Sequence, residues 1–160
     1  MIAAPRDLLA GDGSPRTLSL RHTHTGESLS LAYANGSAYL ADALARLSWF
    51  LRDFRSGESC AIDPQLLDRL HQLSGLTGTR VPFEVISAYR SPGTNEALRR
   101  RGAGVASRSL HLEGRAIDVR LADVSLADLR EAATSLRAGG VGYYPRSGFV
   151  HLDTGRTRRW

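Results

Sequence analysis

Two histidines and one aspartate in the second half of the chain have the residue types and surroundings of metal ligands. His111 lies in a short polar loop, Asp118 lies inside the apolar run Ala-Ile-Asp-Val, and His151 lies in Phe-Val-His-Leu-Asp. A carboxylate buried in an apolar strand is costly unless a cation, a hydrogen-bonding cluster or a metal accompanies it. Two histidines and one carboxylate resemble catalytic zinc sites, which leave a fourth position for water. A lone histidine in a strand is more often structural, and an aspartate there more often pairs with an arginine, so spacing alone leaves both interpretations open.

Elements predicted from the hydropathy pattern must bring these residues together. Alternation of apolar and polar residues predicts two hairpins and two further strands, over 17–33, 81–89, 116–121 and 141–153. Apolar residues at helical spacing, with capping residues, predict four helices, over 40–51, 63–73, 94–101 and 125–136. Strands and helices are mixed without a regular βαβ rhythm. We therefore predict an α+β fold with a central antiparallel sheet and helices packed on it.

Length and composition limit the organisation of the chain. Its 160 residues, 42% of them hydrophobic, suffice for one domain with a real core. We expect a flexible N-terminal segment over 1–15, which is rich in Gly, Pro and Asp, and a single domain over 16–160 that acts as a monomer. No run approaches the ~18–20 apolar residues of a membrane span. Cys60 is the only cysteine, so internal disulfides are excluded.

Charge is the unusual bulk property. The formal net charge is +5, and all 21 basic residues are arginine. Lysine-free usage is typical of a GC-rich genome, whereas a functional interpretation would be an anionic partner such as nucleic acid or an acidic cell-wall polymer. Only 7% of the residues are aromatic, and they are not interleaved with arginine. Nucleic-acid binding is therefore not expected.

A longer motif surrounds the candidate ligands. The pattern SxHxxGxAxD is complete in this chain, as Ser109, His111, Gly114, Ala116 and Asp118. Together with Ser87-Ala88-Tyr89-Arg90-Ser91 upstream and a last histidine on a strand, it resembles the zinc D-Ala-D-Ala peptidases. These are the M15 (LAS) metallopeptidases, which share a fold with the Hedgehog signalling domain. The chain from Arg16 to Trp160 is most similar to their DUF882/YcbK-like branch, which includes periplasmic murein endopeptidases.

The resemblance implies a zinc-dependent peptidase that hydrolyses peptide bonds in peptidoglycan stems or cross-links. It implies His111, Asp118 and His151 as the zinc ligands. It also implies that Arg90 reaches the substrate, where a guanidinium can hold a carboxylate or carbonyl by paired hydrogen bonds, and that Ser109 faces the site. Such an enzyme acts in the periplasm or outside the cell. The N-terminal Ala3-Ala4-Pro5 is compatible with the remnant of a cleaved secretion signal.

One departure from the family concerns proton transfer. Many M15 enzymes carry a catalytic Glu three residues before the last zinc histidine, or a His two before it, and here Gly148 and Phe149 occupy those positions. Asp153 is our candidate for the catalytic base, because residues two apart on a strand share a face with His151. A turn cap is the competing interpretation for Asp153. Weaker candidates are Glu113 as a base and the tyrosines 143 and 144 as oxyanion donors. The missing Glu or His also motivates a second hypothesis, a non-catalytic, metal-stabilised module that binds cell-wall glycopeptide.

Overall fold

The N-terminal part of the fold is a β-hairpin, as the alternation predicts. The structure is a computed structural model that describes residues 13–102, 104 and 106–160. Strand β1 (Pro15–His22) pairs antiparallel with β2 (Ser28–Asn35), and the short β3 (Ala38–Tyr39) extends the sheet beyond β2. The flexible segment expected over 1–15 lies outside the described residues as far as residue 12, and Pro15 already belongs to β1.

The strands form one mixed sheet of eight, in the order β3-β2-β1-β4-β5-β7-β6-β8. Its remaining members are β4 (Phe83–Ser87), β5 (Ala116–Arg120), β6 (Gly140–Tyr144), β7 (Phe149–Asp153) and β8 (Arg158–Arg159). The α+β class is confirmed. The fully antiparallel sheet is wrong at two pairs, because β1–β4 and β6–β8 are parallel. The connection from β2 to β4 contains two helices, and a crossover of that length allows the chain to re-enter beside β1 in the same direction.

Four helices begin at sequence signals close to those predicted. They are α1 (Ala41–Phe50), α2 (Pro64–Thr77), α3 (Pro92–Arg100) and α4 (Leu126–Ser135). The side chains of Asp63, Ser91 and Ser125 accept hydrogen bonds from backbone N–H groups of the first turns of α2, α3 and α4. Among the described residues, no helix combines the length and apolar character that crossing a membrane requires.

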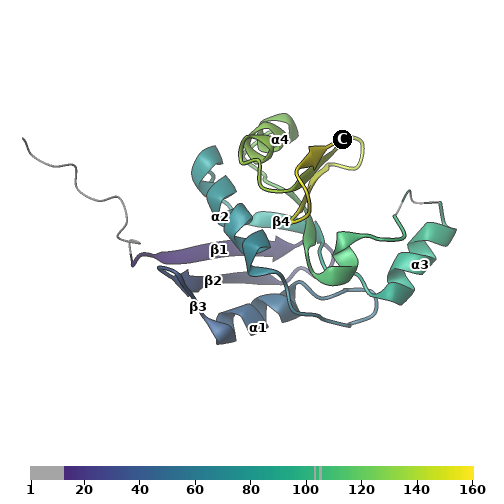
Figure 1. The fold of residues 1–160 in the computed structure, drawn as a ribbon, viewed down its shortest axis with the longest axis horizontal. Coiled ribbons are helices and arrows are strands. Elements are labelled where there is room, and N and C mark those ends of the chain that lie inside the picture. Colours follow the sequence, from purple (N-terminus) through teal and green to yellow (C-terminus); the bar gives the residue numbers. More distant parts are fainter. Residues whose placement is uncertain (1–12, 103, 105) are drawn as a thin grey trace, which may run out of the picture.

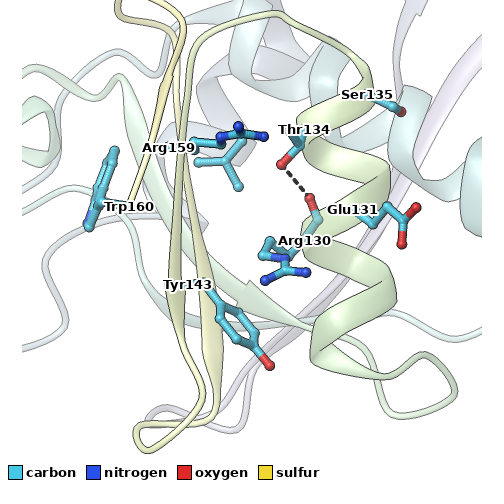
Figure 2. Close-up of a pocket in the computed structure, with 8 residues that line it drawn as sticks. Arg130, Glu131, Thr134, Ser135, Tyr143, Arg159 and Trp160 are labelled. Atoms are coloured by element: carbon cyan, nitrogen blue, oxygen red, sulfur yellow. Dashed lines mark hydrogen bonds between the residues drawn. The ribbon is translucent and has the colours of Figure 1, made fainter.

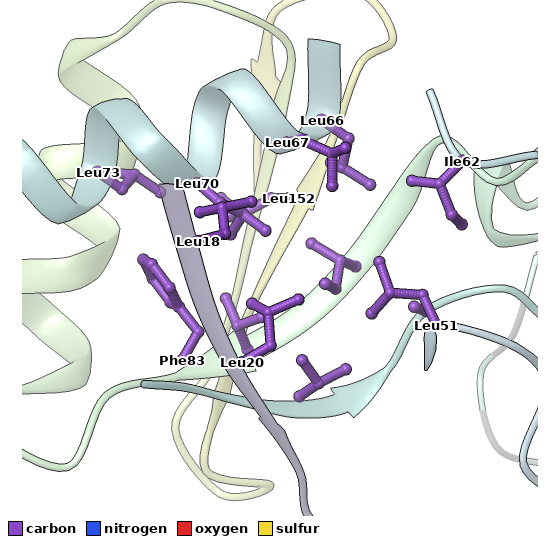
Figure 3. Packing of buried hydrophobic residues seen from close by; sticks show 14 of the residues in the cluster. Leu18, Leu20, Leu51, Ile62, Leu66, Leu67, Leu70, Leu73, Phe83 and Leu152 are labelled. Atoms are coloured by element: carbon purple, nitrogen blue, oxygen red, sulfur yellow. The ribbon is translucent and has the colours of Figure 1, made fainter. Parts of the chain in front are cut away.

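The hydrophobic core lies between the sheet and the helices (Figure 1). Helix α2 packs over β1, α4 packs over β6 and β7, and the two helices contact each other. Leucines at helical spacing on α2 meet alternate residues of β1, β4 and β7 (Figure 3), including Leu66, Leu67, Leu70 and Leu73 with Leu18, Leu20, Phe83 and Leu152. The core thus fixes the strands that carry the candidate ligands.

A buried aspartate fixes the turn after β4. The N–H of Tyr89 donates to the carbonyl of Leu51, and the N–H of Ser91 donates to Asp53 Oδ2 at 2.9 Å. Burial alone would raise the pKa of Asp53, but hydrogen bonds from Thr94, Ser91 and Arg55 lower it from 3.8 to about 2. The residue between Tyr89 and Ser91 is Arg90, so this carboxylate helps to place the predicted substrate-binding arginine.

We predict that Asp53→Asn lowers the free energy of unfolding at pH 7 by about 1–3 kcal/mol, because an amide NH₂ would face backbone N–H donors. A depressed folded-state pKa gives stability that is complete above the unfolded pKa and is lost as the folded pKa is approached. The difference between the two proteins should therefore shrink as the pH falls from about 4 towards about 2. Urea unfolding at several pH values measures this difference in the free energy of unfolding. Glu131 is exposed on α4, so Glu131→Gln is the control. It is expected to change the free energy of unfolding by less than about 0.5 kcal/mol. A pH-independent difference would contradict the prediction.

Candidate metal centre

Pairing between β5 and β7 brings two of the three predicted ligands together. The strands are antiparallel, and Asp118 lies directly opposite His151. Directly opposite residues on adjacent strands point to the same face, so both side chains enter one space. The Asp118 carboxylate is 8% exposed and the His151 ring is 12% exposed. The register of two apolar strands therefore places a buried carboxylate against a buried imidazole.

The third ligand is carried by a single 3₁₀ turn, Leu110–Glu113, which precedes β5. Ser109 caps this turn by accepting a hydrogen bond from the N–H of His111 at 3.4 Å. The turn ends at Gly114, whose φ of +66° disfavours other residues, and a Cβ there would also clash with the backbone of Ala61. Gly114 is thus required in the motif by local backbone geometry.

Hydrogen bonds join this turn to the end of β4. The N–H of Arg90 donates to the carbonyl of His111 at 3.0 Å, and His111 Nδ1 lies 2.6 Å from the carbonyl oxygen of Ala88. A carbonyl can only accept, so Nδ1 carries the hydrogen and the neutral ring presents Nε2 as a lone-pair donor. The fold therefore selects the ligand atom of His111.

The three side chains fit a tetrahedral metal ion. Asp118 Oδ1 lies 3.4 Å from His111 Nε2 and 2.9 Å from His151 Nδ1, and one ligand atom from each residue can be chosen within 4.8 Å of the others. Metal–ligand bonds of about 2.0–2.2 Å in a tetrahedron place ligand atoms roughly 3.3–3.5 Å apart. The spacing between Asp118 and His111 matches this value, and that between Asp118 and His151 is shorter. The three residues form a His-Asp-His donor set with room for further ligands.

The electrostatics of the cluster favour a cation. Burial alone would raise the pKa of Asp118, but the contacts with His111 and His151 hold it well below its usual range. Burial alone would lower the pKa of His151, but hydrogen bonds to Asp118 and Asp153 raise it above its usual value. The carboxylates thus favour positive charge at the point where a metal ion would replace the proton.

The ligand atoms open into a pocket with a volume of about 320 Å³. Its lining includes the arginines 90, 108 and 158 and the aromatic residues Tyr144, Phe149 and Trp160. Ser109 also lines it, as predicted. The pocket therefore combines the candidate metal ligands with groups that suit an anionic, partly apolar ligand.

Arg90 has hydrogen-bond donors that the described residues do not use. Its side chain is buried, and its only described side-chain hydrogen bond is from Nη1 to Asn95 Oδ1 at 3.3 Å. The buried Nε has no partner in the described structure. Burial lowers the pKa of this guanidinium, and Asp118 partly offsets the effect. Arg90 lines the pocket, and its guanidinium is only partly hydrogen-bonded in the described structure, so it is suited to bind a ligand there.

The candidates for proton transfer are placed differently from one another. Asp153 shares a face with His151, as the strand alternation predicts, and Oδ2 lies 3.1 Å from His151 Nε2. Its role as a base stays a prediction. Glu113 is exposed, pairs with Arg115 and does not line the pocket. Tyr144 lines the pocket, whereas Tyr143 faces the opposite side of β6.

Sequence reasoning missed the C-terminal residues of the site. Strand β8 joins the edge of the sheet, and Trp160 lies over Gly142, with its ring centroid 5.3 Å from that of His151. Its Nε1 donates to the hydroxyl of Tyr144 at 2.7 Å. A strand of two residues has no periodicity to detect. The absence of a side chain at Gly142, which leaves space for the indole, was the available signal.

A second groove of about 570 Å³ lies between α4 and the strands β6 and β8 (Figure 2). The guanidinium of Arg130 lies over the ring of Tyr143, 4.8 Å from its centroid, and Arg159 lines the same groove. Trp160 lines this groove as well as the pocket at the candidate ligands. The groove contains none of the candidate ligands, so the chemistry of the molecule is concentrated at the first pocket.

Comparison with known proteins identifies relatives along nearly the whole chain. Residues 11–160 match the family model Peptidase_M15_2, described as peptidoglycan L,D-endopeptidase MepK. The chain is 50% identical over 146 residues to the peptidoglycan L,D-endopeptidase MepK of Escherichia coli K12, covering 91% of this chain and 80% of that protein. It is 42% identical over 147 residues to the probable peptidoglycan L,D-endopeptidase MepK of Haemophilus influenzae, covering 91% and 79%. No solved structure matches it.

We predict that His111→Ala and His151→Ala each lose at least about 100-fold in affinity for a divalent ion, more than the loss of a group that only orients a ligand. Equilibrium dialysis with Zn²⁺ followed by elemental analysis measures the affinity and the stoichiometry, expected to be one ion per chain. His24→Ala, in the exposed turn between β1 and β2, is the matched control and should bind like the parent. Equal binding by all three variants would refute the assignment.

Proposed function

Because the chain belongs to the M15 peptidase family described as peptidoglycan L,D-endopeptidase MepK, we propose that it is a metal-dependent endopeptidase that cuts peptide cross-links of peptidoglycan. The observation that carries the proposal is the buried set His111, Asp118 and His151 beside an arginine with open donors. The printed activity of relatives that are 42–50% identical supports the same substrate. Residues 16–160 would form the catalytic unit, with a Hedgehog-like fold.

We propose zinc as the metal. Two imidazoles and one carboxylate, with a fourth position left open, are a donor set that suits catalytic zinc. When bound, zinc supplies Lewis acidity, which polarises a carbonyl oxygen and makes a water molecule more acidic. The protein contributes the donor atoms His111 Nε2, Asp118 Oδ1 and His151 Nδ1, already held close together. Little reorganisation of these side chains is then needed on binding.

Arg90 and Ser109 would bind the peptide. A cross-linked peptide offers carbonyl oxygens and free carboxylates near the bond to be cut, and both can accept from a guanidinium. The Arg90 N–H bond to the His111 carbonyl couples the position of the arginine to that of a ligand. The substrate would therefore be held at a fixed place relative to the metal, which is the main requirement for efficient attack on one bond.

The aromatic side of the pocket would contact the apolar parts of the same peptide. Tyr144 and Phe149 stack with ring centroids 4.8 Å apart, and Trp160 is 50% exposed beside His151. Phe149 occupies a position at which other M15 enzymes carry a histidine, so in this chain it contributes packing instead of proton transfer. Asp153 is the candidate for the base that the sequence offers.

The substrate determines where the protein would act. Peptidoglycan lies outside the cytoplasmic membrane, so the proposed enzyme would work in the periplasm or at the cell surface. Every proposed ligand and binding group comes from one chain, so a monomer would suffice. The alternative function, a non-catalytic cell-wall-binding module, shares the metal site and differs only in releasing no product.

We predict that the purified protein releases soluble muropeptides from isolated peptidoglycan, loses this activity with a chelator and regains it with zinc. Liquid chromatography and mass spectrometry of the digest identify which cross-link is cut. Catalytically inactive His151→Ala is the control for contaminating hydrolases. If the parent protein sediments with peptidoglycan but releases nothing from any cross-link type, the binding-module function replaces the enzyme.

Arg90→Gln should lower kcat/KM by about 10- to 100-fold, since a charge-assisted hydrogen bond contributes about 1.5–3 kcal/mol. The loss should lie mainly in KM, while the zinc content stays at that of the parent. Arg21→Gln, an exposed arginine on β1, is the matched control and should leave both values unchanged. A parallel loss of zinc in Arg90→Gln would instead assign Arg90 a structural role.

A further inference from the structure

Both ring nitrogens of His151 lie against carboxylates, although the metal site uses only one of them. Nδ1 faces Asp118 Oδ1 at 2.9 Å, within the ligand cluster, and Nε2 faces Asp153 Oδ2 at 3.1 Å, on the other side of the ring. A carboxylate only accepts hydrogen bonds, so each contact calls for a hydrogen on the ring. If a metal ion replaces the hydrogen on Nδ1, within the ligand cluster, the contact with Asp153 holds the remaining hydrogen on Nε2. The nitrogen left with a lone pair is then Nδ1, which points at the other ligands.

Both oxygens of the Asp153 carboxylate accept several hydrogen bonds. Oδ1 accepts from the N–H of Gly140 at 3.1 Å, from the N–H of Gly155 at 2.8 Å and from Arg158 Nη1 at 3.1 Å. Oδ2 accepts from Arg158 Nη2 at 2.7 Å in addition to His151. The side chain is 0% exposed. A carboxylate with five donors and no solvent contact has a fixed orientation.

The backbone of this residue is also fixed. Arg69, buried on α2, donates from Nη1 to the carbonyl oxygen of Asp153. A Cβ at Gly140 would lie too close to the Asp153 carboxylate, so the close approach of β6 requires glycine. The helix α2, the strand β6 and the C-terminal segment thus converge on one side chain that touches a metal ligand.

We infer that Asp153, clamped by Arg158, is a positioning residue that sets the tautomer and the ring orientation of His151 for metal binding. The inference rests on the proposed metal site. It gives His151 the same arrangement as His111, whose Nδ1 hydrogen is held by the Ala88 carbonyl while Nε2 is left for the metal. Ligating histidines commonly donate their second N–H to a carboxylate or carbonyl, which also makes the ligand more basic.

A general base and a positioning residue predict different defects. A base acts on the bound water or the leaving amine, so its loss lowers the rate by about 10²- to 10⁴-fold and leaves metal affinity unchanged. Loss of a group that orients a ligand lowers metal affinity by about 10- to 100-fold. In Asp153→Asn the amide oxygen favours the Oδ1 position, which accepts from three donors, whereas Oδ2 accepts from two. The NH₂ group then faces His151 Nε2, and the hydrogen bond to the ring is lost.

Metal affinity is measured by competition for Zn²⁺ with a chromophoric chelator, and ligand geometry by the visible absorption spectrum of the Co²⁺-substituted protein. Neither readout needs a substrate, so a negative result for peptidoglycan hydrolysis would leave this test intact. We expect Asp153→Asn to bind Zn²⁺ 10- to 100-fold more weakly and to show an altered Co²⁺ spectrum, with peptidase activity largely recovered at saturating zinc.

Asp68→Asn is the matched control. Asp68 is likewise engaged by an arginine, Arg16, and by the hydroxyls of Tyr33 and Tyr39, but it lies away from the metal site. Its variant should lose stability without a change in metal affinity. Where Asp153→Asn does not fold, Arg158→Gln removes the clamp and keeps both partners, and it should weaken Zn²⁺ binding. The inference would be overturned if a folded Asp153→Asn variant kept the Zn²⁺ affinity and the Co²⁺ spectrum of the parent. Where Asp153→Asn does not fold, the same result in Arg158→Gln would overturn it.

Discussion

The register between β5 and β7 is the constraint on which the site depends. It sets Asp118 opposite His151 in the middle of the sheet. The flanking residues of the two strands face the hydrophobic core, namely Ile117, Val119, Val150 and Leu152. Because side chains alternate along a strand, a slip of one residue would exchange the apolar and the ligand faces. The free energy of core burial therefore also maintains the spacing of the ligand atoms. A buried carboxylate and imidazole are tolerated here because each is compensated by the other.

Charge compensation extends outward from this pair, and two buried arginines near it, Arg69 and Arg90, keep donors without a partner in the described structure. Asp118 is balanced by the two histidines, and Asp153 by Arg158 and His151. Arg90 is different, since it is buried near Asp118 and yet retains an unpartnered Nε in the described structure. An unsatisfied buried donor is costly for stability. Its position at the rim of the ligand cluster is consistent with a group whose partner arrives with the substrate.

The pocket also explains how the chain differs from other M15 enzymes around the last histidine. Phe149 stacks on Tyr144 and, with Trp160, forms an apolar side of the pocket beside the ligand histidine. Of the two positions at which the wider family carries proton-transfer groups, one holds Phe149, which adds aromatic contact area, and the other holds Gly148, which has no side chain. The carboxylate that remains near His151 is Asp153, which is enclosed by donors and supports the ring from behind. The role of Asp153 in positioning His151 therefore does not depend on whether Asp153 acts as a catalytic base.

The sequence by itself determined the local features of the protein. Alternation and helical spacing predicted the two hairpins and the four helices, and the motif around His111 and Asp118 pointed to the ligand set, because capping, hydropathy and motif spacing are local properties. Tertiary structure decided the rest. The parallel entry of β4 beside β1 and of β8 beside β6 depends on long-range packing that no local period encodes. The choice of ligand atom on each histidine depends on acceptors that are distant in sequence or lie across the strand, such as the Ala88 carbonyl for His111. The surroundings of Asp153 could not be read from its place on β7, because the groups that enclose it come from α2, β6 and the C-terminal segment and meet only in the folded chain.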